Sequence, residues 1–200
     1  MNTRIHVVVG ILYNVNRDKV LITKRTGKQF LSGYWEFPGG KVKSNEDSFS
    51  ALSREFFEEL GVCLKSAKRL IKIHHDYPEK KLLLDVWEIY EWEGEPIGLE
   101  SQEINWVEKN NLFKYKFPEA NKHIIQTLYL PDIYGISENF YKNYSNLFSA
   151  ARNYFNSGLK IFQLRHSFER NSISRENIKE LHEEARRNTA KLILNGVASD

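Results

Sequence analysis

The sequence predicts a mixed α/β protein with two parts: a mixed sheet with helices packed on its faces, followed by a short segment of alternating strands and helices. Two observations predict this fold class. Up to about residue 130, strand-like runs outnumber helix-like ones and are joined by short turn-forming clusters. Beyond that point the order becomes strand, helix, strand, helix, strand, which is typical of βαβ units in a parallel sheet. We therefore expect two domains, residues 1–131 and 132–200.

The first segment is expected to contain two hairpins, a further strand and two helices. RIHVVVGILY and KVLITKR are joined by the turn-forming NVNRD and predict a hairpin, and RLIKIHHDYP with KLLLDVWEIYEW predicts a longer one. Between the hairpins we expect a loop and then a helix from about Asn45 to Leu60, with Ser44 as N-cap and Gly61 just after the last turn. INWV is expected to be a short strand, and EANKHIIQTLYL a helix that ends at Pro131.

The second segment is expected to form three strands and two helices. DIYGI, LKIFQLR and AKLILNG read as strands. ENFYKNYSNLFSAARNYFNS reads as a helix that stops at Gly158, and SRENIKELHEEARRN as a helix with Ser174 as N-cap. The predicted order is therefore βαβαβ, with all three strands parallel.

Composition excludes several classes of protein. The formal net charge of +3 is too small to indicate a polymeric nucleic acid or a membrane surface as partner. No apolar run approaches the roughly 18–20 residues that a membrane-spanning helix needs, and the N-terminus does not resemble a signal peptide. Cys63 is the single cysteine, so an internal disulfide is excluded and a reducing compartment fits. We expect a cytoplasmic protein.

The predicted helix over residues 45–60 gathers its acids on one side. At 100° per residue, an apolar stripe is formed by Phe49, Leu52, Phe56 and Leu60. Glu55, Glu58 and Glu59 fall on a neighbouring arc, with Arg54 on its flank, where it could pair with a carboxylate and orient it. Carboxylates this close repel one another, and a hard cation such as Mg²⁺ relieves the repulsion by binding their oxygens. The alternative is an acidic face that only meets solvent.

The spacing around these acids is more specific than the acids themselves. It runs Gly40, five residues, Glu46, seven residues, Arg54-Glu55, Phe56, one residue, Glu58-Glu59, one residue, Gly61-Val62. This pattern resembles the Nudix box at every position. Nudix enzymes hydrolyse nucleoside diphosphates linked to another group, using divalent cations held on this loop and helix. The resemblance implies the Nudix α-β-α sandwich fold, Mg²⁺ as cation with Mn²⁺ as second choice, and these metal ligands: Glu55, Glu58, Glu59, the carbonyl oxygen of Gly39, and Glu100 from outside the helix.

Residues 5 to about 130 resemble the MutT branch of the family, which hydrolyses 8-oxo-dGTP to 8-oxo-dGMP and pyrophosphate and so removes mutagenic nucleotides from the pool. The similar stretches are VVVGILYN, LITKR, WEFPGGK, YEWEGEPIGLESQEINWV and FPEANKHI. Asn121 stands where this branch has an Asn that recognises the base. A side-chain amide can accept from N7–H of 8-oxoguanine and donate to O6, whereas N7 of guanine carries no hydrogen. Arg25 matches a nucleotide-contacting Arg, and Lys41 is expected to contact phosphate.

The resemblance implies a metal-assisted attack of water at the β-phosphorus. Glu55 is our first choice for the group that takes the proton of the water, and Glu100 the second. Two alternatives stay open. The substrate could be another nucleoside triphosphate or a pterin triphosphate, or the domain could bind a nucleotide without hydrolysing it.

The second segment resembles the first three strands of thiamine-phosphate synthase, a (β/α)₈ barrel, in YGIS, GLKIFQLR and LILNG. The chain would then contain an incomplete barrel, and thiamine-phosphate synthesis is not expected of it. Parallel strands normally need both faces covered, and an open edge strand invites pairing. We therefore expect the helices to pack on their own small sheet, or a homodimer to cover its edge.

Overall fold

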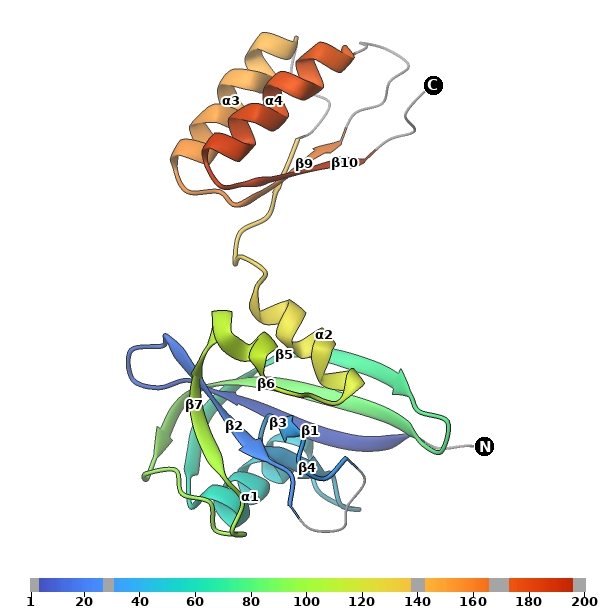
Figure 1. Cartoon of the computed structure of the whole chain (residues 1–200), viewed down its shortest axis with the longest axis vertical. Helices are drawn as coiled ribbons and strands as arrows, with labels where there is room; N and C mark the ends of the chain where they lie inside the picture. The colour runs from blue at the N-terminus through green and yellow to red at the C-terminus, as the bar shows by residue number, and fades with distance from the viewer. Residues whose placement is uncertain (1–3, 27–30, 138–142, 166–172, 196–200) are drawn as a thin grey trace. The chain divides into compact units, whose positions relative to one another are not determined.

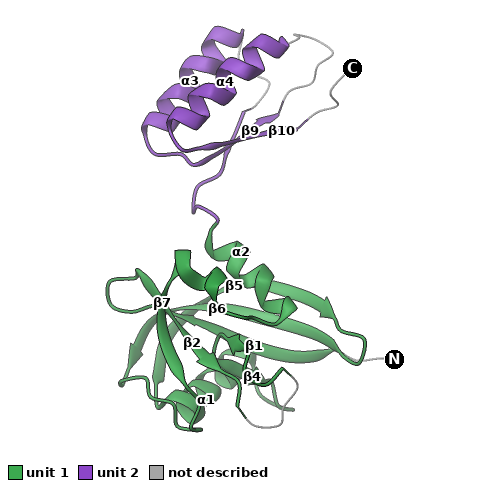
Figure 2. Cartoon of the chain, in the orientation of Figure 1, with its two compact units in different colours: residues 1–129 green, residues 130–200 purple. Residues whose placement is uncertain are grey.

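The computed structural model describes residues 4–26, 31–137, 143–165 and 173–195. The chain divides into two compact units, residues 1–129 and 130–200 (Figure 2). This boundary lies two residues before the expected one. In the described ranges no helix combines the length and the hydrophobicity needed to cross a membrane.

Two sheets form the centre of the first unit. The four-stranded sheet has the order β4 (Gly39–Lys41), β1 (Ile5–Leu12), β6 (Lys81–Glu93), β5 (Cys63–Asp76). It is mixed, because β1 runs parallel to β6 and antiparallel to β4. The three-stranded sheet is antiparallel, with the order β3 (Trp35–Glu36), β2 (Lys19–Lys24), β7 (Ile104–Glu108).

The longer predicted hairpin is confirmed as β5 and β6. The first predicted hairpin is wrong, because β1 and β2 lie in different sheets and share only a bridge between Tyr13 and Val20. The turn itself forms, since the Asn14 side chain accepts hydrogen bonds from the backbone N–H groups of Asp18 and Lys19. Along one edge β1 pairs with β6, and on the other edge Val7–Val9 pair with β4, so β2 can meet only the C-terminal end of β1.

Helix α1 (Ser48–Leu60) begins later than predicted. Its N-cap is Asp47, whose carboxylate accepts hydrogen bonds from the N–H groups of Phe49 and Ser50 at 2.9 and 3.0 Å, so Ser44 is not the cap. Asn45 has a left-handed backbone, with φ of 74°, which a helix starting there could not contain. The predicted end is confirmed, because Gly61 caps the helix with φ of 70°.

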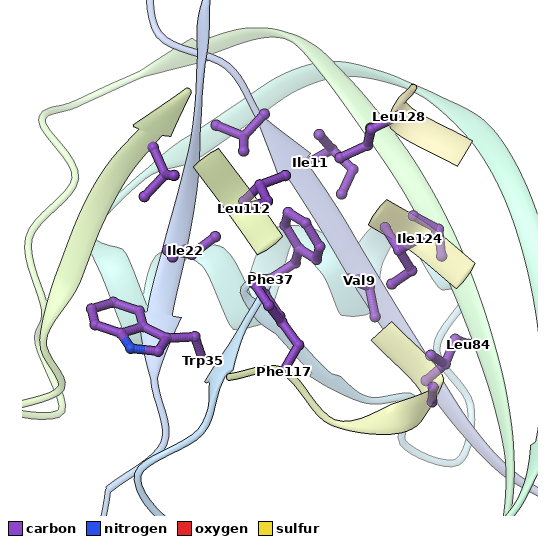
Figure 3. Close-up of a cluster of buried hydrophobic side chains, with 14 of the residues drawn as sticks. Val9, Ile11, Ile22, Trp35, Phe37, Leu84, Leu112, Phe117, Ile124 and Leu128 are labelled. Atoms are coloured by element: carbon purple, nitrogen blue, oxygen red, sulfur yellow. The ribbon is translucent and has the colours of Figure 1, made fainter. Parts of the chain in front are cut away.

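The helices of the first unit cover opposite faces of the sheets (Figure 1). Helix α2 (Glu119–Leu128) packs on a core drawn in Figure 3, which includes Val9, Ile11, Ile22 and Phe37. The 3₁₀ helix η1 (Lys109–Lys114) adds Leu112 to this core. Helix α1 packs on the other face through Leu52, Phe56 and Leu60. The Phe56 ring lies so close to β1 that a Cβ on Gly10 would be 2.4 Å from it, and this contact fixes α1 against the sheet.

The second unit has the predicted βαβαβ order: β8 (Gly135–Ile136), α3 (Tyr144–Asn156), β9 (Ile161–Arg165), α4 (Arg175–Arg187), β10 (Lys191–Asn195). The strands are parallel in the order β10-β9-β8. Both helices pack on one core with Phe162 and Leu164. Ser174 is confirmed as N-cap of α4, in a capping box with Asn177. The helices thus pack on the small sheet of their own unit, which was the first of the two expected alternatives.

Candidate active site

A cavity of about 370 Å³ lies in the first unit between the two glycines of β4, the C-terminal turn of α1 and the first turn of α2. It brings together six of the residues singled out from the sequence: Arg25, Gly39, Lys41, Glu59, Glu100 and Asn121. Arg54, Glu55 and Glu58 are not among its lining residues. The apolar lining includes Val9, Phe37 and Ala120.

The two glycines of β4 allow the backbone to approach both β1 and the helix closely. Gly39 has φ of +146°, and a Cβ there would lie 2.1 Å from the carbonyl oxygen of Val8. A Cβ on Gly40 would lie 2.2 Å from the carboxyl carbon of Glu55. Any larger residue at position 40 would therefore displace Glu55, which explains why β4 needs glycine there.

Arg54 connects the loop before α1 to the acids on the helix. Its guanidinium donates to Glu46 at 2.8 Å, to Glu55 at 2.8 Å and to Glu58 at 3.0 Å, and also to the carbonyl oxygen of Lys41 at 3.1 Å. Hydrogen bonds from Arg54 and from the backbone N–H of Lys43 lower the pKa of Glu46 to about 2. The arrangement matches the predicted pairing of Arg54 with a neighbouring carboxylate.

Glu59 lies among other carboxylates. Burial, followed by the nearby charges of Glu55, Glu36 and Glu100, raises its pKa to about 8, while a hydrogen bond from the backbone of Gly39 opposes the shift. Near neutral pH the carboxyl group of Glu59 is therefore protonated, unless a cation binds beside it.

Glu36 was not singled out from the sequence. It lies on β3, lines the cavity and forms an ion pair with Arg25. Burial raises the pKa of its carboxyl group, and Arg25 opposes this. The sequence feature that could have indicated Glu36 is its position in WEFPGG, three residues before Gly39. In the structure it lies on the short strand β3.

The carboxylate oxygens at the cavity, from Glu36, Glu59 and Glu100, are ligands of the kind that a hard divalent cation prefers. Repulsion among the carboxylates around Glu59 is relieved when a cation binds them, and Mg²⁺ prefers such ligands together with substrate phosphate oxygens and waters. Within the described ranges, no three His, Cys, Asp or Glu side chains already converge as a finished metal-binding group. The prediction that three helix glutamates point to one place therefore holds only in part: Glu59 lines the cavity, Glu55 lies against Gly40, and Glu58 is half exposed.

Asn121 lies in the first turn of α2 and is 9% exposed. It does not cap the helix, since the N-cap residue is Pro118 and no side chain caps that end. In the part of the chain that the structure describes, its side-chain amide makes no hydrogen bond, although it lines the cavity. A nearly buried amide that faces a cavity is suited to bind a polar ligand group there.

The family model of the NUDIX domain matches residues 8–127. The chain belongs to this family. It is 33% identical over 125 residues to the 8-oxo-dGTP diphosphatase of Escherichia coli (strain K12), a match that covers 62% of this chain and 96% of the relative. The 8-oxo-dGTP diphosphatase of Haemophilus influenzae is 37% identical over 124 residues, which cover 62% of this chain and 90% of the relative.

Solved structures agree with the family assignment. A MutT structure from work on Aliivibrio salmonicida and Vibrio cholerae superposes with a TM-score of 0.56 at 36% identity, covering 63% of this chain and 97% of the other. A MutT NUDIX hydrolase from Burkholderia pseudomallei gives a TM-score of 0.58 at 24% identity, covering 63% and 98%, and supports the fold alone. The first unit therefore has the Nudix fold with a mixed sheet.

Proposed function

We propose that this Nudix chain hydrolyses 8-oxo-dGTP to 8-oxo-dGMP and pyrophosphate and so removes oxidised nucleotides from the pool. The observation that carries the proposal is a single cavity that is lined by two acidic residues, Glu59 and Glu100, and by Asn121. Identities of 33% and 37% to 8-oxo-dGTP diphosphatases, over nearly their whole length, support this substrate.

The phosphate end of the substrate would lie at the acidic part of the cavity. Glu55, Glu58, Glu59, Glu100 and the carbonyl oxygen of Gly39 would hold Mg²⁺, or Mn²⁺ as second choice. When bound, the cation neutralises phosphate charge and lowers the pKa of attacking water. Glu55, which is mostly buried and held by Arg54, is our first choice to accept the proton of the water, and Glu100 the second. Arg25 and Lys41 also line the cavity and supply positive charge for nucleotide and phosphate.

The base end would lie at Asn121. Its amide oxygen would accept from N7–H of 8-oxoguanine and its amide nitrogen would donate to O6. With dGTP the same oxygen would face the lone pair of N7. Because the amide is nearly buried, leaving its oxygen without a hydrogen-bond donor is unfavourable. The chain should therefore bind dGTP more weakly than 8-oxo-dGTP.

Hydrolysis in water labelled with ¹⁸O tests both the reaction and the position of attack. We expect 8-oxo-dGTP and Mg²⁺ to give 8-oxo-dGMP and pyrophosphate, with the label in pyrophosphate because attack is at the β-phosphorus. Omitting Mg²⁺ and adding a chelator should stop the reaction. Label in the nucleotide product would contradict the position of attack, and absence of both products would contradict the proposal.

A second candidate substrate is CTP. The chain is 28% identical over 123 residues to the CTP pyrophosphohydrolase of Escherichia coli (strain K12), at 61% coverage of this chain. Cytosine has no N7, so Asn121 would then have a different role. Faster pyrophosphate release from CTP than from 8-oxo-dGTP would favour this candidate.

For residues 132–200 we propose a thiamine-phosphate-synthase-like segment without synthase activity of its own. The parallel β10-β9-β8 sheet with α3 and α4 supports this assignment. A homodimer formed through this segment, and a cytoplasmic location, remain expectations. Sedimentation of the full chain tests the dimer, and a monomer at all concentrations would contradict it.

A further inference from the structure

The loop of residues 97–102, which follows β6, is hydrogen-bonded to the C-terminal end of α1. The N–H of Ile97 donates to the carbonyl oxygen of Leu60 at 3.1 Å, and the N–H of Leu99 donates to that of Glu59 at 2.9 Å. The last carbonyl groups of a helix have no partner within the helix, so the loop satisfies two of them. Glu100 follows Leu99 directly, and these bonds therefore bring its backbone to the turn that carries Glu59.

The side chain of Gln102 makes a second connection between the same two places. Its amide oxygen accepts from the N–H of Glu100 at 2.8 Å, and its amide nitrogen donates to the carbonyl oxygen of Glu59 at 2.9 Å. Gln102 also lines the cavity. One neutral side chain thus links the backbones of two acidic residues that both face the cavity.

The turn that carries Gln102 is tightly packed. A Cβ on Gly98 would lie 2.1 Å from the carbonyl oxygen of Gln102 and 3.1 Å from its amide oxygen. Ser101 has φ of 62°, and its N–H donates to the carbonyl oxygen of Gly98 at 3.3 Å. The loop therefore has a defined conformation around Gln102.

We propose that Gln102 is a positioning residue that holds Glu100 beside Glu59, so that the two carboxylates can bind the same cation. The proposal rests on the proposed metal-dependent hydrolysis. An amide is required because the side chain must accept from one backbone and donate to the other. Glutamate would place a second acceptor against the carbonyl oxygen of Glu59 and add a charge to the acidic cluster. Methionine has a similar length and neither makes nor opposes these bonds.

The test compares the full chain with its Gln102→Met variant, and with Gln126→Met as a matched control on the exposed side of α2. Mn²⁺ binding without nucleotide is measured by electron paramagnetic resonance. Loss of a group that orients a metal ligand typically costs about 10–100-fold in metal affinity. We expect a loss of at least about 10-fold for Gln102→Met and none for Gln126→Met. Unchanged Mn²⁺ affinity in Gln102→Met would overturn the proposal.

Turnover and amide exchange give independent readouts. In Gln102→Met we expect kcat to fall while KM for 8-oxo-dGTP changes little, because Asn121 is untouched. In the unchanged chain we expect slow hydrogen exchange at the N–H of Glu100, and this can be measured even if the variant fails to fold. Fast exchange at Glu100 in the unchanged chain would also overturn the proposal.

These outcomes separate the role of Gln102 from the identity of the substrate. If the unchanged chain hydrolyses no 8-oxo-dGTP but Gln102→Met still weakens Mn²⁺ binding, the proposed substrate is wrong and the role of Gln102 stands. If 8-oxo-dGTP is hydrolysed and Mn²⁺ binding is equal in both chains, the substrate stands and the role of Gln102 is wrong.

Discussion

The two units contain cavities of similar size but of different chemistry. The cavity of the first unit, about 370 Å³, is lined by charged groups of both signs, including Arg25, Glu59 and Glu100. A cavity of about 350 Å³ in the second unit is lined mostly by apolar and neutral groups, with Asp132 and Lys160 as its charged residues. Size therefore does not distinguish them. The two cavities differ in that several titratable groups converge on the first. This convergence indicates a functional site in the first unit and not in the second.

The units also differ in how they cover their sheets. In the first unit α1 and α2 pack on opposite faces, and each carries a residue that lines the cavity, Glu59 on α1 and Asn121 on α2. In the second unit α3 and α4 share one core, and Ile136 and Ile193 stay 49% and 40% exposed. The matched family region, residues 8–127, lies within the first unit. The comparison predicts that changes in the first unit affect hydrolysis, whereas matched changes in the second do not.

The largest effect is expected for Glu55→Gln. Loss of a group that accepts or orients a proton typically costs about 10²–10⁴ in rate, and we expect kcat for 8-oxo-dGTP to fall by at least about 100-fold. The matched control is Glu183→Gln on α4, whose side chain is 68% exposed. Steady-state kinetics of both variants measure the effect. A comparable fall in kcat in both variants, or no fall in either, would contradict the expected difference between the two units.

A smaller effect is expected for Asn121→Ala. Only the bond from N7–H distinguishes the oxidised base, because O6 is an acceptor in guanine too, and a buried amide oxygen left without a donor costs about 1–3 kcal/mol. The preference for 8-oxo-dGTP over dGTP, measured as the ratio of kcat/KM values, should therefore fall by about 10–100-fold. Asn146→Ala on α3 removes an exposed amide in the second unit and serves as control. An unchanged ratio in Asn121→Ala would favour a substrate that is recognised by other groups.

A smaller, pH-dependent effect is expected on stability. Folding raises the pKa of Glu59 from 4.5 to about 8, through burial first and then through Glu55, Glu36 and Glu100. The folded chain therefore binds a proton that the unfolded chain releases, and the stability this provides is fully present below pH 4.5 and is lost as the pH rises through 8. Without divalent cations, the free energy of unfolding of the first unit should fall across this range.

Urea unfolding at both ends of the range measures this, with and without Mg²⁺. Mg²⁺ should stabilise the first unit more at the upper end, where Glu59 is ionised, because cation binding requires the ionised ligand. Glu59→Gln should reduce both the pH dependence and the effect of Mg²⁺. The same pH dependence in Glu59→Gln and in the unchanged chain would show that another group is responsible.

The local features of the site could be predicted from the sequence. These features follow from residue spacing along one loop and one helix. They are the acids of α1, the two glycines before it and Gly61 after it. The sequence predicts the start of α1 too early, because Ser44 and Asp47 are both favoured N-cap residues and the pattern alone does not choose between them.

Features that depend on distant partners could not be predicted. The separation of β1 and β2 into two sheets follows from the pairing of β1 with β6, which lies far along the chain. Glu36 became recognisable only when its burial and its ion pair with Arg25 were known. The bonds of Gln102 to Glu59 and Glu100 likewise depend on a contact between residues 43 positions apart.

The central claim is that residues 1–129 hydrolyse 8-oxo-dGTP in preference to dGTP without help from the second unit. The most direct measurement is pyrophosphate release from the two nucleotides side by side, with Mg²⁺, by the full chain and by residues 1–129 alone. We expect a strong preference for the oxidised nucleotide and equal kcat/KM values for both chains. Equal turnover of the two nucleotides, or loss of activity when residues 130–200 are removed, would contradict the claim.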